Sequence, residues 1–258
     1  MLLAIDVGNT ETVLGVFQGP ELEWHWRMAT RGRTTPDELA LTYAGFLEQQ
    51  GLSFSRQITG VVLASVVPEQ TQALREMVRR YFHFDPVVLE PGVRTGMPIL
   101  YDNPREVGAD RIANAVAAFD QFGGPAVVVD FGTATKFEVI SAAGEYLGGV
   151  IAPGIRISAA ALFGAAALLP NVEILTPRSI IGKSTVESIR AGLVLGTAAM
   201  VDGLIERIAK EQGPAVVIAT GGLAALVSSH CASVQHCEPW LTLRGLRLIY
   251  ERNAGGDG

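Results

Sequence analysis

The chain opens with the stretch LLAIDVGNT at residues 2–10, and the stretch AVVVDFGTA at residues 126–134 has the same form. In each, an apolar run typical of a buried strand leads into Asp, any residue, Gly and a small polar residue, and a second apolar run follows. The two aspartates, Asp6 and Asp130, stand almost half of the 258-residue chain apart. A repeat of so long a period predicts a duplicated domain rather than a repeat array.

The duplication predicts two α/β lobes, residues 1–116 and residues 117–258. Each lobe is expected to open with a β-hairpin whose turn carries an aspartate, and the two lobes are expected to enclose a cleft. Glycine in such a turn frees backbone amides that bind phosphate, and the carboxylate can hold a hydrated Mg²⁺. A facing pair of these turns suits ATP, whereas either one alone is typical of an ordinary hairpin turn.

The pattern of apolar, capping and turn residues predicts alternating strands and helices along the rest of the chain. The clearest helix start is a capping box at Thr35 and Glu38, with Pro36 at the first helical position. The expected strands are residues 2–5, 13–17, 22–28, 58–66, 86–89, 126–129, 137–140 and 215–219, and residues 146–151 are expected to form a strand or a turn. Besides the helix after Thr35, the expected helices are residues 68–82, one carrying Val107 to Phe119, an Ala-rich one within 157–169, 185–211, a short one after Gly222, and 241–252.

Two further groups of residues suggest chemistry. Asp110 and Arg111 stand side by side near the start of a predicted helix, where Asp can accept a proton from a substrate hydroxyl and Arg can bind an anion. The alternative is a solvated helix face with an acid near its N-terminus. Gly221 and Gly222 follow a predicted strand, and glycine there lets an adenine or ribose approach the backbone closely, although such a pair is also typical of a plain turn.

Composition excludes several classes of protein. Asp plus Glu number 26 against 20 Lys plus Arg, and no basic run is present, so nucleic acid is not an expected partner. The apolar start is too short for a signal sequence, and the apolar segment 157–169 is too short to span a bilayer. Two cysteines do not indicate a disulfide scaffold, so we expect a cytoplasmic protein. The pairs His230-Cys231 and His236-Cys237 match no common zinc module, and a metal there stays an open alternative.

Six motifs, in order from residue 2 to about residue 253, together resemble the type III pantothenate kinase family. The resemblance implies the fold of the acetate and sugar kinase–Hsp70–actin superfamily, in which two actin-like (ribonuclease H-like) α/β lobes enclose an interdomain cleft. It also implies a homodimer that transfers the γ-phosphoryl group of ATP to pantothenate, giving 4'-phosphopantothenate in the first step of coenzyme A synthesis. The motifs are Asp6 to Thr10, Ser65 to Pro68, Tyr101 to Pro104 with Gly108 to Arg111, Asp130 to Thr135, Gly148 to Gly154, and Leu243 to Asn253.

The resemblance also implies roles for individual residues. Asp110 would be the general base, Asp6 would organise Mg²⁺, and Asp130 would bind a monovalent cation, K⁺ or NH₄⁺. Thr185 would reach pantothenate from the partner subunit. The remaining expected roles are phosphate or ATP binding by Gly8, Asn9, Thr10, Thr133 and Gly221, and pantothenate binding by Tyr101, Gly108, Ala109 and Arg111.

Two positions depart from the family pattern, in which Thr, Phe and Asp usually follow Thr135, and the replacement of Asp by Glu is the milder change. Here the residues are Lys136, Phe137 and Glu138. Since a Lys ammonium is a compact point charge on a flexible stem, Lys136 could occupy the cation site itself and weaken the need for added cation. The alternative is that Lys136 turns to solvent or pairs with Glu138 on the same face of a strand.

Two other classes of function stay open from the sequence. Some proteins of this shape are accessory factors in transcription, but a pure binding module has no need of the retained acidic residues and of Arg111. A kinase of the same fold acting on another small alcohol or acid is the second alternative, and only a panel of substrates separates it from a pantothenate kinase.

Overall fold

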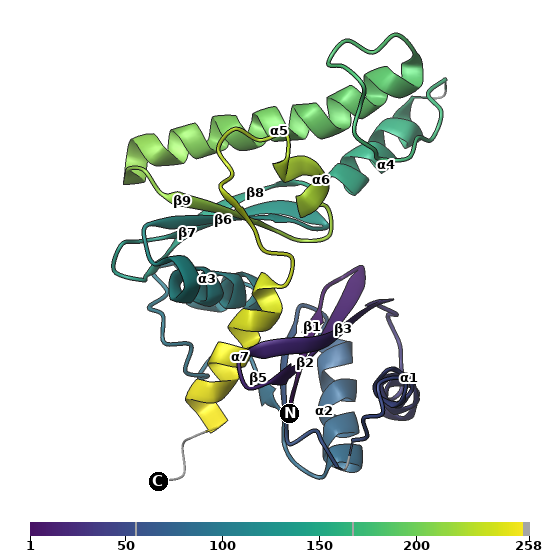
Figure 1. Ribbon diagram of the computed structural model, residues 1–258, viewed down its shortest axis with the longest axis vertical. Helices are drawn as coiled ribbons and strands as arrows, with labels where there is room; N and C mark the ends of the chain where they lie inside the picture. The colour runs from purple at the N-terminus through teal and green to yellow at the C-terminus, as the bar shows by residue number, and fades with distance from the viewer. Residues whose placement is uncertain (55, 167, 255–258) are drawn as a thin grey trace. The chain divides into compact units, whose positions relative to one another are not determined.

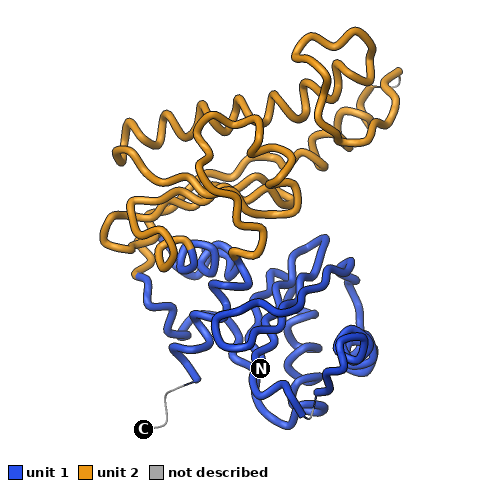
Figure 2. Tube along the Cα trace, in the orientation of Figure 1, with its two compact units in different colours: residues 1–97, 102–117, 242–258 blue, residues 98–101, 118–241 orange. Residues whose placement is uncertain are grey.

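The computed structural model describes residues 1–54, 56–166 and 168–254. It divides into two compact units, which are described separately (Figure 2). Unit 1 comprises Met1–Met97, Asp102–Ala117 and Thr242–Gly258, and unit 2 comprises Pro98–Tyr101 and Ala118–Leu241. Unit 1 therefore takes in residues of both predicted lobes, because Thr242–Gly258 lies at the C-terminal end of the second. The lobe boundaries at residues 1–116 and 117–258 stay a prediction.

Unit 1 is built on a five-stranded sheet with strand order β3-β2-β1-β4-β5. Its first three strands are antiparallel neighbours, whereas β4 runs parallel to β1 and β5 runs parallel to β4. Such mixed pairing follows from the connections, because a hairpin joins antiparallel strands and a helical crossover joins parallel ones. The strands are β1 (Leu2–Val7), β2 (Glu11–Gln18), β3 (Glu21–Ala29), β4 (Gly60–Ser65) and β5 (Val87–Val88).

Helices cover both faces of this sheet. On one face, α1 (Pro36–Glu48) and α2 (Pro68–Phe82) bury apolar side chains against alternate residues of β1, which include Ile5 and Val7. On the other face, α7 (Leu241–Ala254) approaches so closely that a methyl group added to Gly15 would lie 2.7 Å from Leu243. This contact explains why α7 belongs to unit 1, although the sequence places it after the strands of the second lobe.

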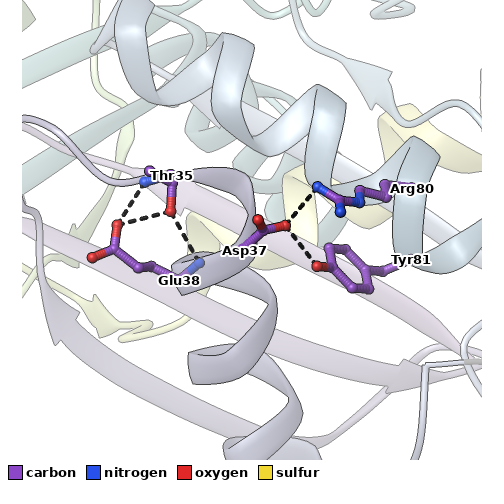
Figure 3. Close-up of polar contacts among 5 residues, drawn as sticks. All are labelled: Thr35, Asp37, Glu38, Arg80 and Tyr81. Atoms are coloured by element: carbon purple, nitrogen blue, oxygen red, sulfur yellow. Dashed lines mark hydrogen bonds and ion pairs between the residues drawn. The ribbon is translucent and has the colours of Figure 1, made fainter.

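The N-terminus of α1 has the predicted capping box (Figure 3). The side-chain oxygen of Thr35 accepts a hydrogen bond from the backbone N–H of Glu38 at 3.3 Å, and the Glu38 carboxylate accepts one from the backbone N–H of Thr35 at 2.8 Å. In the same first turn, Asp37 accepts hydrogen bonds from Arg80 and Tyr81 of α2 and so ties the two helices together. The bond to Asp37 raises the pKa of the Tyr81 hydroxyl above its usual value.

The substitution Thr35→Ala is expected to lower the free energy of unfolding by about 1 kcal/mol, the usual contribution of an N-cap side chain. The backbone N–H of Glu38 would lose its partner, but no proposed substrate contact would change. Chemical denaturation of both proteins measures the difference, with Thr42→Ala, a half-buried threonine inside the same helix and away from its N-terminal cap, as the control. Equal stability of the wild type and Thr35→Ala would show that the cap contributes nothing.

Unit 2 repeats the architecture of unit 1. Its sheet has the order β10-β9-β6-β7-β8, in which β6, β7 and β8 are antiparallel neighbours and β9 and β10 are parallel. The leading strands β1 and β6 even share one burial pattern, with the aspartate as the half-buried fifth of six residues. The predicted duplication is confirmed. The strands are β6 (Ala126–Phe131), β7 (Ala134–Ile140), β8 (Tyr146–Pro153), β9 (Val216–Thr220) and β10 (His236–Cys237).

Three helices cover one face of the second sheet: α4 (Ile155–Ala165), α5 (Thr185–Gln212) and α6 (Ala224–Ser228). The long helix α5 runs along this face, and Ile189, Leu193 and Val201 on it pack into the core of the unit (Figure 1). Among the described residues, α5 is also the one helix long and apolar enough to cross a membrane by length and composition. Its packing against the sheet accounts for the apolar residues on that side.

A few local expectations were wrong. Val107 was expected in a helix, but it ends a short 3₁₀ helix (Pro104–Glu106), and α3 (Ala109–Phe122) begins two residues later. Asn103 starts the 3₁₀ turn, because its side chain accepts a hydrogen bond from the backbone N–H of Arg105. Strand β10 was not predicted at all, since two exposed residues carry no periodic pattern.

Candidate active site

The first Asp-x-Gly turn joins β1 to β2 at the edge of unit 1. Asp6 is half-buried near the end of β1, and Asn9 and Thr10 are exposed. The backbone N–H of Gly8 donates to the carbonyl oxygen of Glu11 at 3.0 Å, which closes the turn. A carboxylate beside a closed, solvent-facing turn is an arrangement that can hold a phosphate group together with its metal ion.

Thr30, just after β3, fixes the shape of this turn. Its hydroxyl donates to the carbonyl oxygen of Gly8 at 2.8 Å, and its backbone N–H donates to the carbonyl oxygen of Thr10 at 2.9 Å. The buried hydroxyl of Thr12 lies 2.9 Å from that of Thr30 and steadies it. Sequence reasoning missed both threonines, because the register between β2 and β3 that brings them together is not visible in the local pattern.

Asp110 and Arg111 lie in the first turn of α3, in unit 1. A methyl group added to Gly108 would lie 2.6 Å from Oδ1 of Asp110, so glycine leaves the space that this carboxylate occupies. Arg111 is buried, with 6% of its surface exposed. A carboxylate at the N-terminus of a helix is stabilised in its charged form by the helix dipole, and the charged form is the one that accepts a proton.

Tyr101 belongs to unit 2, so the motif from Tyr101 to Arg111 is divided between the units. Its ring lies 6.3 Å from that of the fully buried Tyr146, measured between centroids. A methyl group on Gly148 would lie 3.6 Å from the Tyr101 ring. Tyr101 therefore lies over the first residues of β8, with Gly148 beneath its ring.

The second Asp-x-Gly turn joins β6 to β7 and carries Asp130 and Thr133. The turn closes through a hydrogen bond from the N–H of Gly132 to the carbonyl oxygen of Ala134 at 3.1 Å, and Thr133 is exposed. Opposite Asp130 in the antiparallel register stands Lys136. The Lys136 ammonium nitrogen lies 2.8 Å from Oδ2 of Asp130, so a positive charge is already fixed on this carboxylate.

Gly221 lies on the other side of the Asp130 carboxylate. It follows β9 with φ of +96°, a conformation that residues with a side chain rarely adopt. A methyl group there would lie 2.4 Å from Oδ1 of Asp130 and 2.8 Å from the backbone of Phe131. Within the chain, the close neighbour of Gly221 is the Asp130 turn, and the expected approach of an adenine or ribose stays a prediction.

Thr185 is the first residue of α5, and it lines an open pocket of about 850 Å³. Ser184 caps this helix by accepting a hydrogen bond from the N–H of Glu187. The backbone N–H of Arg178 donates a hydrogen bond to the Glu187 carboxylate, and the guanidinium of Arg190 lies beside it. Both interactions lower the pKa of Glu187. The bond from Arg178 also ties the loop before α5 to the helix. The pocket lies entirely in unit 2, between α4, the segment around Leu169 and α5.

The histidine–cysteine pairs do not gather into a metal site. In the parts of the chain that the structure describes, no group of three or more His, Cys, Asp or Glu side chains is placed to hold a metal ion. Cys231 donates a hydrogen bond to the carbonyl oxygen of Val227, and burial raises the pKa of its thiol to about 12. The half-buried Cys231 is therefore tied to the end of α6.

The predicted site residues thus fall into groups within each unit. Unit 1 holds the turn from Asp6 to Thr10 and the start of α3 from Gly108 to Arg111. Unit 2 holds Tyr101, Thr185 and a cluster in which Asp130, Lys136 and Gly221 are in contact. Two matched acidic turns on a duplicated sheet, with a further carboxylate at a helix start, place this protein in the actin-like class of folds, and turns of this kind suit phosphate groups.

Comparison with known structures agrees with this class. The activator of 2-hydroxyisocaproyl-CoA dehydratase from Clostridium difficile, solved with bound ADPNP, superimposes with a TM-score of 0.60 at 12% identity, covering 100% of this chain and 98% of the other. A ROK hexokinase from Thermus thermophilus gives a TM-score of 0.55 at 16% identity, covering 98% and 99%. At such low identity these likenesses establish the fold, and the predicted actin-like duplication is confirmed.

Sequence comparison then gives the family. The model of the type III pantothenate kinase family matches residues 2–207. A curated type III pantothenate kinase from Acidothermus cellulolyticus is 58% identical over 256 residues, which cover 98% of this chain and 99% of the relative. The chain belongs to the type III pantothenate kinase family.

Proposed function

We propose that this protein is an ATP-dependent pantothenate kinase that makes 4'-phosphopantothenate, the first step of coenzyme A biosynthesis. The observation that carries the proposal is identity of 58% to a type III pantothenate kinase along nearly the whole of both chains. The acidic residues on which phosphoryl transfer would depend, Asp6, Asp110 and Asp130, are all retained. An accessory factor without catalysis would have no need of them.

In the proposed reaction, Asp110 accepts the proton of the primary hydroxyl of pantothenate as that oxygen attacks the γ-phosphorus of ATP. The bond between the γ-phosphorus and the bridging oxygen breaks, and ADP leaves with the bonding electrons. Arg111 donates hydrogen bonds to an anionic group of the substrate or of ATP. The space beside Gly108 lets the Asp110 carboxylate take its position, and Tyr101, Gly108 and Ala109 line the pantothenate site.

The two turns are proposed to hold ATP. Gly8, Asn9 and Thr10 of the first turn bind phosphate oxygens, while Thr133 and Gly221 contact the nucleotide from the second. A carboxylate such as Asp6, half-buried beside an exposed turn, suits Mg²⁺, which proteins commonly bind through one or two carboxylates and the phosphates. That ion would neutralise charge on the phosphates, and the chain itself would supply orientation and the base.

The direct test is a substrate panel. Purified protein with ATP and Mg²⁺ is expected to release ADP when pantothenate is added, and mass spectrometry of the product should find one phosphoryl group on pantothenate. Related small alcohols and acids, including sugars, are the comparison compounds. Faster phosphorylation of one of these would assign the site to a different substrate, which is the alternative that the fold leaves open.

The protein is also proposed to be a cytoplasmic homodimer whose partner subunit contributes Thr185. Six of the ten large apolar side chains that are exposed in the described residues lie between residues 157 and 181, in α4 and the loop before α5. An apolar surface of this extent is typical of an interaction site. Ala167 of the Ala-rich segment 157–169 lies outside the described residues.

The net charge of −6 provides no attraction for nucleic acid.

Light scattering is therefore expected to give twice the 27.4 kDa of one chain. Ile181→Asp places a charge in the proposed interface, where Ile181 is 75% exposed, and should shift the protein toward monomer. Leu41→Asp is the matched control, because Leu41 on α1 is 77% exposed but lies outside that surface. A wild-type mass of one chain across a wide concentration range would contradict the dimer.

A further inference from the structure

We propose that the ammonium group of Lys136 is a built-in monovalent cation, so that this kinase needs no added K⁺ or NH₄⁺. The inference deepens the proposed function and rests on it, because the Lys136 charge would affect the reaction only if Asp130 lies in the ATP site. The family resemblance leads one to expect a free cation at Asp130. The residues around that carboxylate do not fit one.

The ion pair is short and well shielded. The distance of 2.8 Å between the Lys136 nitrogen and Oδ2 of Asp130 is that of a charge-assisted hydrogen bond. Only 15% of the Lys136 side chain and 13% of the Asp130 side chain are exposed. At this degree of burial the attraction is screened much less than between two surface charges. The Lys136 ammonium group is therefore held at the Asp130 carboxylate.

The backbone fixes this pair before any ligand arrives. Asp130 and Lys136 are direct cross-strand partners in the antiparallel β6–β7 ladder, so their side chains start from neighbouring positions on one face of the sheet. Glu138, the partner that the sequence suggested, stands two residues from Lys136 on β7 and opposite Val128. The ion pair between Lys136 and Asp130 shows that the Lys136 side chain is not turned freely into solvent.

The rest of the Asp130 carboxylate is closely surrounded. Its second oxygen, Oδ1, faces Gly221, where even a methyl group would lie at 2.4 Å. A free K⁺ at Oδ2 would compete with a tethered group of the same charge, which repels it. The tethered group has the advantage, because it has already lost its translational freedom in folding, whereas a free ion loses it on binding. Lys136 thus supplies the charge that a dissolved cation would otherwise bring.

The test compares potassium, ammonium and tetramethylammonium chlorides at equal ionic strength. The wild-type rate with ATP and pantothenate should be the same in all three salts. In Lys136→Thr the charge is gone and space is opened, so the rate should be low in tetramethylammonium and rise about tenfold or more in potassium, the scale of one lost charge-assisted hydrogen bond. Lys210→Thr, which removes an exposed Lys paired with Glu206, is the matched control and should behave as the wild type.

A second readout does not depend on the reaction. Binding of a cation to the folded state raises the thermal unfolding midpoint. Replacing tetramethylammonium by potassium should therefore raise the midpoint of Lys136→Thr and leave that of the wild type unchanged. If the panel finds another substrate, this result still stands, so failure of the proposed function can be told apart. A strong potassium effect on the wild-type rate or midpoint, or a Lys136→Thr variant as active as the wild type in tetramethylammonium, would overturn the proposal.

Discussion

Asp110→Asn should lower kcat by about 10²- to 10⁴-fold, the range that general-base assistance usually contributes. Asparagine keeps the shape of the side chain and still fits beside Gly108, but it cannot accept the proton of the attacking hydroxyl. Because positioning of the reactants dominates phosphoryl transfer, a residual rate should survive, and the affinity for ATP should change little. Steady-state kinetics with an independent measurement of ATP binding separates the two effects.

Asp120→Asn is the matched control for this experiment. It makes the same chemical change on the same helix, α3, but at an exposed position near its other end. Its kcat should equal that of the wild type. If Asp110→Asn turned over at nearly the wild-type rate, Asp110 would not be the base, and Asp130 would be the next carboxylate to test.

The second large effect is expected from Gly221→Ala. Its methyl group would lie 2.4 Å from the Asp130 carboxylate and 2.8 Å from the backbone of Phe131, and a left-handed conformation would add backbone strain. The second turn must then move, so ATP affinity should fall sharply, and the free energy of unfolding should drop by about 1–3 kcal/mol. Calorimetric titration with ATP and chemical denaturation measure the two effects.

Gly213→Ala separates strain from steric overlap. Gly213 also has a positive φ, +84°, but no atom lies within 4 Å of a methyl group placed there. This control should lose some stability and keep its ATP affinity. Equal ATP affinity in Gly221→Ala and the wild type would mean that the Asp130 turn does not take part in nucleotide binding.

Much of the fold could be predicted because its signals are local. The apolar run ending in Asp, repeated at Asp6 and Asp130, gave the duplication, and the capping residues at Thr35 gave the start of α1. The position of α7 could not be predicted, since its neighbours at Gly15 and Gly60 lie far away in sequence. An amphipathic helix shows that it packs against something, but not against which sheet.

The same limit applies to the candidate site. The sequence identified the acidic residues and the glycines, because turns and helix starts need particular residue types at fixed spacing. It left the direction of the Lys136 side chain open, since that depends on the β6–β7 register, and it missed Thr30, whose hydroxyl reaches Gly8 from another strand. Contacts of this kind come from strand pairing, which is set by the whole sheet.

The measurement that tests the central claim most directly is ATP consumption by the purified, folded protein with and without pantothenate, in the presence of Mg²⁺. Pantothenate should stimulate ADP release strongly, and the stimulation should be lost in Asp110→Asn but kept in Asp120→Asn. Circular dichroism and thermal unfolding would establish that each sample is folded. Equal ATP consumption with and without pantothenate in the folded wild-type protein would contradict its assignment as a pantothenate kinase.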